Sequence, residues 1–287
     1  MQQITYQNAD GQEAVFGLTP PFIFEKVEGI HAADTELLTS DSPRHNGSQF
    51  HNLRLRDREI TLYFHIEGKN RQEMYQKRME ALALLSASGG GTGKFVYKND
   101  AGSWWIPAIV KQGPVADSRL QNFNHCQAIF YCPDPNWRSM TETEADLAYS
   151  GFGFELPFEL DTDGVEFGNA VNQAVVTNSG TSSAPLYIRI EGPADCPKVV
   201  KTSTGEYIRL KTQLSSDQSL LIDTTHDNAS VQIEDSSGKL TNGFGYLDLN
   251  SVLFQLDPGE NILLYESSDD TLQTRVSVRF YHSYEGV

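Results

Sequence analysis

The chain has 287 residues, with 39% hydrophobic and 21% charged side chains, which is typical of a folded protein and argues against a disordered one. No apolar run approaches the roughly 18 residues of a membrane-spanning helix, and the first residues lack the basic start and apolar core of a signal peptide. The length is enough for one large or two medium domains.

Charge divides the chain into two parts. Through Met140 there are 14 Lys and Arg against 15 Asp and Glu, a net charge of −1, whereas the remainder has 8 against 23, a net charge of −15. This asymmetry favours two domains with different surroundings. An acidic second half argues against a nucleic acid or an anionic membrane as its partner, because phosphate binding depends on clustered Lys and Arg. Its simplest interpretation is a domain that faces solvent.

Residues 31–57 have an unusual composition. They follow short apolar segments, typical of strands, in residues 3–29, and they are polar, rich in turn residues and long for a connection. Their main apolar residues are Leu37, Leu38, Phe50 and Leu53, too few to build a core. The composition fits either an arm that orders against another surface or a floppy surface loop, and both interpretations stay open here.

A strand and a helix are predicted next. Alternation in residues 59–66 places Ile60, Leu62, Phe64 and Ile66 on one face of a strand. A helix is predicted over residues 69–86. Its apolar residues fall within an arc of about 140° that we expect to lie on a sheet: Met74, Tyr75, Met79, Leu82 and Leu85.

A hairpin of residues 94–98 and 103–110 follows, and then a strand over residues 125–132 that ends at Pro133. Cys126 and Cys132 lie six positions apart in this strand, about 20 Å at 3.3 Å per residue, which is too far for a disulfide. With Cys196 the count is odd, so all three are interpreted as small buried hydrophobes. Residues 141–155 are predicted to be a linker.

The second half shows no convincing helix. Short segments with strand composition recur every 10–15 residues or so, which suits a two-sheet sandwich of the jelly-roll or galectin-like kind. The segments are 174–177, 186–190, 207–210, 219–222, 230–233, 252–256, 261–265 and 275–281. The predicted fold class is therefore mainly β, with a single helix in the first half.

The sequence contains only weak matches to motifs that bind phosphate or metal ions. The segment Gly89-Gly-Gly-Thr-Gly-Lys94 is not a phosphate loop. Ser88 stands where the motif has its first glycine, and Phe95 where it has Ser or Thr. The segment also runs from helix to strand, whereas a phosphate loop runs from strand to helix. Residues 161–166 resemble the start of a calcium loop without its later ligands. The seven histidines, including His45 and His51 in the polar segment, show no metal-ligand spacing. We expect no catalytic residue, no cofactor and no metal site.

The succession of elements in residues 58–137, from strand to helix, glycine run, Trp104-Trp105 hairpin and the Cys-Pro-Asp-Pro-Asn-Trp137 ending, resembles the distal tail proteins of long-tailed bacterial viruses. The second half is similar to their C-terminal domain in the order of Gly192-Pro193, Thr204-Gly205-Glu206, Ile222-Asp-Thr and the segment 256–261.

The resemblance implies a division of labour. Residues 1–140 would form a mixed β domain with one helix that closes a ring, with six copies expected, and residues 156–287 would form an acidic sandwich. Residues 31–57 would be an arm reaching the neighbouring subunit through Leu37, Leu38, Phe50 and Leu53. The protein would be a non-enzymatic hub in the tail of a phage or prophage.

The same resemblance implies partners and a location. The ring would join the tail tube protein to the tail-tip or tail-associated protein, with receptor-binding proteins as further partners. It would be assembled in the host cytoplasm and end at the virion tail tip. The alternative is a galectin-like module that binds cell-surface carbohydrate during adsorption. The absence of Trp after position 137 counts against that alternative, because Trp is the usual sugar-stacking residue.

Overall fold

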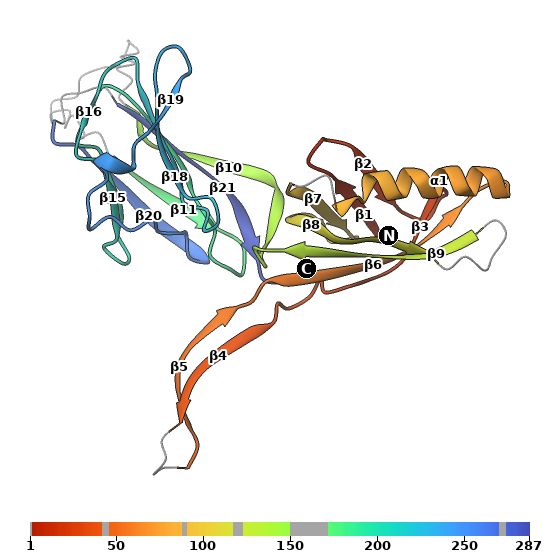
Figure 1. Ribbon diagram of the computed structural model, residues 1–287. Helices are drawn as coiled ribbons and strands as arrows, with labels where there is room; N and C mark the ends of the chain where they lie inside the picture. Colours follow the sequence, from red (N-terminus) through yellow and green to blue (C-terminus); the bar gives the residue numbers. More distant parts are fainter. Residues whose placement is uncertain (1, 42–45, 88–90, 117–122, 150–171, 270–273) are drawn as a thin grey trace, which may run out of the picture. The chain divides into compact units, whose positions relative to one another are not determined.

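The computed structural model describes residues 2–41, 46–87, 91–116, 123–149, 172–269 and 274–287 (Figure 1). The chain divides into two compact units, which are described separately. The first unit comprises Met1–Met140 and Tyr284–Val287, and the second comprises Thr141–Ser283. The fold class is confirmed as mainly β, with one α-helix among the described residues. That helix is not long and apolar enough to cross a membrane.

In its described residues the first unit contains ten strands, the last of which continues into the second unit, and helix α1 (Arg71–Leu84). The strands are β1 (Gln3–Gln7), β2 (Glu13–Phe16), β3 (Phe22–Glu28), β4 (Thr35–Asp41), β5 (Ser48–Leu55), β6 (Arg58–Glu67), β7 (Gly93–Lys98), β8 (Ser103–Ala116), β9 (Phe123–Cys132) and β10 (Trp137–Tyr149).

Strand β8 joins two halves of the sheet in this unit. Its first part pairs with β7, in the order β2-β1-β7-β8, and its later part pairs with β9, in the order β8-β9-β6-β3. The register of β8 against β9 shifts twice, at Val110/Gln112 and Gln112/Val115. Bulges of this kind bend a strand and raise its twist, so β8 can turn from one partner to the other.

The core of the first unit follows the predicted alternation. Ile60, Leu62, Phe64 and Ile66 on β6 are all fully buried. Phe130 packs at a steep angle against two rings, with centroids 4.8 Å from Tyr6 and 4.9 Å from Phe95. The remaining fully buried aromatic side chains of this core are Phe16 and Trp137. Aromatic packing therefore supplies much of the apolar area that stabilises the unit.

The helix was predicted correctly in position but not in orientation. Asn70 caps it by accepting a hydrogen bond from Glu73 N at 2.9 Å, so α1 is slightly shorter than residues 69–86. Its buried residues are Met74, Ala81 and the capping Leu85. The expectation that Tyr75, Met79 and Leu82 also lie on the sheet is wrong, because they are 43%, 66% and 36% exposed. The small Ala81 lets the helix approach the sheet along a narrower stripe than the apolar arc.

Arg58 ties together distant parts of the first unit. It is 4% exposed at the start of β6, and its guanidinium donates only to backbone carbonyl oxygens. Nη1 binds Gly29 O at 2.7 Å and His31 O at 2.5 Å, Nε binds Pro135 O at 2.9 Å, and Nη2 binds Glu285 O. Burial lowers the pKa of this guanidinium from its ordinary value, and these hydrogen bonds compensate for its lost hydration.

The second unit is a sandwich of two antiparallel sheets. One sheet has the order β19-β18-β17-β12-β21-β10, the other has the order β11-β20-β14-β15, and β13 pairs with β16. Its elements are β11 (Gln173–Asn178), β12 (Tyr187–Glu191), β13 (Ala194–Asp195), β14 (Lys198–Lys201), β15 (Tyr207–Arg209), β16 (Gln213–Leu214), β17 (Ser219–Asp223), β18 (Ser230–Glu234), β19 (Leu240–Asn242), the short 3-10 helix η2 (Phe244–Tyr246), β20 (Gly259–Glu266) and β21 (Arg275–Tyr284).

Both sheets contribute to the core of the sandwich. Ile188, Ile222 and Val278 come from the first sheet, and Val199 and Leu263 from the second, and each is at most 1% exposed. Short strands with alternating inward residues were predicted for this half, and seven of the eight predicted segments contain a strand. The segment 252–256 does not, because it is buried through Phe254 and Leu256 but makes only one bridge, between Leu256 and Ala184.

The linker predicted over residues 141–155 is wrong for its first part. Residues 141–149 complete β10, and the rest lies outside the described residues. The exposed side chains of Glu142, Glu144 and Asp146 alternate with inward positions, of which Leu147 is 1% exposed. The chain therefore passes between the units within a strand rather than through an irregular segment.

Candidate functional site

The polar segment of residues 31–57 folds as a regular two-stranded arm, β4–β5. Its register runs from Thr35 opposite Leu55 to Asp41 opposite Ser48, with one bulge between Leu38 and Thr39. Among the described strands, β4 and β5 pair only with each other (Figure 1). This regular pairing favours the arm interpretation over the floppy loop.

The four apolar residues singled out in the sequence lie on this arm and are all exposed. Leu37 and Leu53 are cross-strand partners, 60% and 47% exposed, and Phe50 is 60% exposed. Leu38, on the opposite face from Leu37, is 41% exposed. A two-stranded hairpin is marginally stable in water without further support. The arm thus combines a weak free-standing fold with an apolar surface that nothing in this chain covers among the described residues.

Cross-strand charges hold the arm in register near its base. Glu36 accepts hydrogen bonds from Arg54 and pairs with Arg56 at 3.4 Å. These two guanidinium groups keep the pKa of Glu36 below its ordinary value. Arg56 N also donates to Asp34 O at 2.8 Å, which brings the two ends of the arm together. The arm can therefore be removed with little change in the path of the flanking chain.

A second exposed apolar surface lies on α1. Tyr75 and Met79 line a shallow hollow with Arg71, Gln76 and Ala83. The Arg71 guanidinium lies 5.6 Å from the centre of the Tyr75 ring. Tyr75 and Met79 on this face were expected to be buried against the sheet but are exposed.

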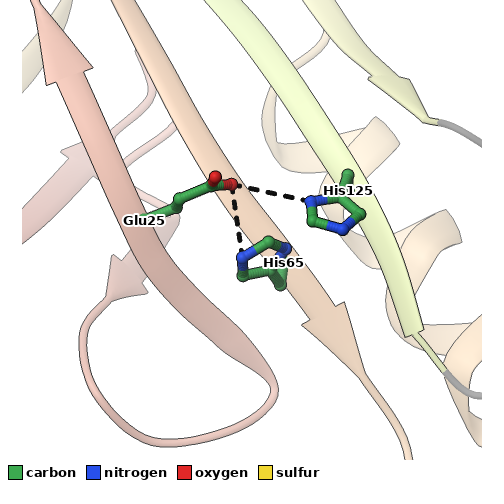
Figure 2. A group of neighbouring side chains, drawn as sticks. All are labelled: Glu25, His65 and His125. Carbon is green, nitrogen blue, oxygen red and sulfur yellow. Dashed lines mark ion pairs between the residues drawn. The ribbon is translucent and has the colours of Figure 1, made fainter.

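A third feature is a cluster of Glu25, His65 and His125 on three neighbouring strands. Glu25 Oε2 lies 3.2 Å from His65 Nε2 and 3.6 Å from His125 Nδ1. The two imidazole rings are 4.2 Å apart at their centroids, with an interplanar angle of 79°. Figure 2 shows the Glu25 carboxylate directed at both rings. Together these side chains are the kind of donor set that could hold a metal ion.

Backbone register explains why the cluster forms. His65 on β6 and His125 on β9 are direct cross-strand partners. On β3, Phe24 faces Phe64 and Lys26 faces Tyr63, so Glu25 is the extra residue of a bulge. Both Glu25 and Lys26 are exposed, while Phe24 and Val27 on either side pack toward the core. The bulge thus aims Glu25 at the outer face of β6.

The sequence analysis missed this cluster, because 40 and 60 positions separate its members and no spacing rule applies. The available signal was the pair of consecutive charged residues, Glu25 and Lys26, between apolar inward positions, which is typical of a bulge. The pairing of His65 with His125 required the strand register. Among the described residues, these three form the one group of His, Cys, Asp and Glu with close ligand atoms.

Other sequence predictions fall in less informative places. Cys126 and Cys132 are buried free thiols on β9, as predicted, and burial raises the pKa of each to about 12. The same prediction is wrong for Cys196, which is a free thiol that is only partly buried. His45, residues 88–90 of the glycine run and residues 161–166 lie outside the described residues.

The carbohydrate-binding alternative would need exposed aromatic residues in the second unit. Phe244 and Tyr246 of η2 are 42% and 50% exposed. They lie in one turn, and Phe244 also lines a hollow with Gln232, Thr241 and Asn242. The alternative therefore stays a prediction.

Comparison with known proteins links both units to phage tails. Residues 9–117 match the family model of the phage tail protein RIFT-related domain. Residues 179–284 match the model of the siphovirus-type tail component, C-terminal domain, which is named after the Dit protein of phage SPP1. A search of curated protein sequences found no match.

Solved structures share the fold along almost the entire chain. The crystal structure of phage SPP1 Dit (gp 19.1), described as a paradigm of the hub adsorption apparatus in phages that infect Gram-positive bacteria, is 16% identical, with a TM-score of 0.66 and 99% of each chain covered. A chain of the phage p2 baseplate in its activated conformation with Ca is 12% identical, with a TM-score of 0.55, covering 97% of this chain and 98% of that one. A second structure of the p2 baseplate, with Sr, gives the same values. At these identities the likeness shows the fold.

Proposed function

We propose, from the premise that this chain belongs to the siphophage distal tail protein family and is a structural protein of the tail hub, that six copies close a ring through the arm β4–β5. The observation that supports this proposal is the arm itself. It is a regular hairpin with four exposed apolar residues, and no other described residue of the chain covers them. In a cyclic assembly each copy offers the same arm to the next, so one modest contact is repeated around the ring.

The arm is suited to an intermolecular contact. Leu37, Leu38, Phe50 and Leu53 would lose their exposure against a neighbouring subunit, which stabilises the hairpin and the ring together. Glu36 with Arg54 and Arg56 fixes the strand register before that contact forms. A preorganised arm loses less conformational entropy on binding than a floppy loop would.

The ring would link other parts of the tail. The relatives named above come from a hub adsorption apparatus and a baseplate, which supports the tail tube protein as a partner on one side and a tail-tip or tail-associated protein on the other. Receptor-binding proteins would attach to the same hub. The protein would be assembled in the host cytoplasm and remain in the virion, and its role would be mechanical rather than enzymatic.

The test is replacement of Thr35–Leu55 by an Asn-Gly turn. Because Arg56 N already donates to Asp34 O, this turn closes the gap with little strain. The native chain is expected to sediment as a ring-sized oligomer and to show rings in negative-stain images, and the arm-less variant is expected to be a monomer with the same melting temperature as dissociated native protein.

A matched pair of variants separates the apolar contact from the hairpin fold. Changing Leu37, Leu38, Phe50 and Leu53 to Ser should also abolish rings, whereas changing the equally exposed polar residues Thr39, Gln49 and Asn52 to Ser should preserve them. Intact rings without the arm, or a native chain that is monomeric at every concentration, would refute the proposal.

A further inference from the structure

The cluster of Glu25, His65 and His125 has no role in the arm-mediated ring, yet three strands converge to form it. We propose that these three side chains bind one divalent transition-metal ion per chain, with Zn²⁺ as the ion that fits best. Two imidazole nitrogens and a carboxylate oxygen form a ligand set that Zn²⁺ uses in proteins, and the fourth position would be taken by water or by a donor from outside the chain.

The spacing of the donor atoms agrees with a shared ion. Ligands at the usual Zn–N and Zn–O distances of about 2.0–2.1 Å in a tetrahedron lie about 3.3 Å from one another. Glu25 Oε2 is 3.2 Å from His65 Nε2 and 3.6 Å from His125 Nδ1, and the ligand atoms all lie within 4.8 Å of one another. Small rotamer adjustments of the half-exposed Glu25 and His125 side chains would bring all three to a common centre.

The protonation states also suit metal binding. A histidine ligates as the neutral imidazole, and burial, partly opposed by Glu25, lowers the pKa of His65 below its ordinary value. The carboxylate of Glu25 supplies a negative charge beside the two rings.

The ligand types decide the class of ion. Ca²⁺ and Mg²⁺ prefer sites made of oxygen atoms, whereas imidazole ligands suit Zn²⁺, Cu²⁺, Ni²⁺ and Co²⁺. A bound ion would link β3, which ends its half of the sheet, to β6 and β9. It would thus fasten the strand that leads into the arm.

The test is calorimetric titration of zinc chloride into the full-length chain after treatment with a chelator. The native chain is expected to bind about one ion, with a rise in melting temperature on saturation. Glu25→Gln and His125→Ala should each weaken zinc binding by about tenfold or more, because loss of an outer-shell partner alone often costs 10–100-fold. His226→Ala, an exposed histidine of the second unit, should leave it unchanged.

Folding is checked by the melting temperatures without zinc, which should match because Glu25 and His125 are 46% and 52% exposed at the side chain. If the less exposed His65→Ala variant fails to fold, those two variants still decide the question. A native chain without saturable zinc binding would overturn the proposal, as would unchanged affinity in a Glu25→Gln, His125→Ala double variant. A stoichiometry of half an ion or less would also overturn it, because the ion would then belong between copies.

Discussion

Both units consist mainly of β-strands, but they differ in net charge and in the surface features that they carry. With Glu285 assigned to the first unit, that unit has 14 basic against 16 acidic residues, a net charge of −2, and the second has 8 against 22, a net charge of −14. The first also carries the arm, the helix and the His-Glu cluster. Like charges at a contact oppose association, so the near-neutral unit is suited to contact copies of itself while the acidic unit stays solvated.

A spectroscopic difference lets the two units be followed separately. All three Trp residues, at positions 104, 105 and 137, belong to the first unit. Their fluorescence therefore reports unfolding of that unit alone, whereas the far-ultraviolet circular dichroism reports both. The following variants use this contrast to test whether the units are independent.

The largest loss is expected from Phe130→Ala in the first unit. Phe130 is fully buried and contacts the rings of Tyr6 and Phe95, so its removal leaves a cavity. The free energy of unfolding should fall by about 3–5 kcal/mol in the Trp-detected urea transition. The control Met79→Ser, at a 66% exposed position, should change it by less than about 0.5 kcal/mol. An equal shift of the second unit's transition would show that the units unfold together.

Arg58→Met should destabilise the first unit by about 3 kcal/mol. The substitution removes a buried guanidinium and, with it, the four hydrogen bonds to the carbonyls of Gly29, His31, Pro135 and Glu285 that tie these segments to β6. The matched control is Arg56→Met, an exposed arginine on the arm, which should cost less than about 1 kcal/mol. Equal losses for the two variants, measured by Trp fluorescence in urea, would contradict the role assigned to Arg58.

Asp257→Asn should affect only the second unit. The Lys201 side chain is 3% exposed, and its ammonium donates to Asp257 Oδ2 at 2.6 Å and to Gln255 O at 2.9 Å. Loss of the carboxylate leaves a buried positive charge with a weaker partner, but Asp257 is 56% exposed, so the cost is limited to about 1–2 kcal/mol. The circular dichroism transition should shift while the Trp transition stays in place, and a shift of both would argue for coupled units.

The smallest effect is expected from Asn70→Ala at the start of α1. Asn70 accepts from Glu73 N, and Glu73 Oε2 in turn accepts from Lys69 N at 2.9 Å, one residue before the N–H that a capping box uses. Loss of the cap should lower the stability of the first unit by about 1 kcal/mol, and Asn70→Asp should retain most of it. The Trp-detected transition midpoint measures both variants, and no loss in Asn70→Ala would show that packing alone fixes the helix.

The sequence predicted the buried face of an element best where its apolar residues followed a single clear periodicity. The alternation around Ile60, Leu62 and Phe64 specified the inward face of β6, since a slip of one residue would expose all of it. The helix failed because its apolar arc was wider than the stripe the sheet could cover, which left Met79 and Tyr75 outside. Whether an apolar residue is covered depends on the neighbouring element, and periodicity along one element does not contain that information.

Long-range register explains the other differences. Glu25, His65 and His125 meet only because β3, β6 and β9 are adjacent and because one bulge shifts β3. The stretch after Met140 was interpreted as a linker, but residues 141–149 complete β10, and Leu147 packs in the core of the second unit. In both cases the deciding contacts lie on other strands, so no local pattern in the sequence could have revealed them.

The hydrogen bond from Arg58 to Glu285 affects when the first unit can complete its fold during synthesis. Residues 284–287 belong to the first unit, but they leave the ribosome only after every residue of the second. Tyr284, whose ring lies 6.4 Å from that of Trp104, and Val287, whose N–H donates to Ile30 O, arrive with them. The unit that carries the arm therefore completes its fold late. A nascent chain that still lacks these residues leaves Arg58 without one of its four acceptors, and the second unit is complete before that contact can form.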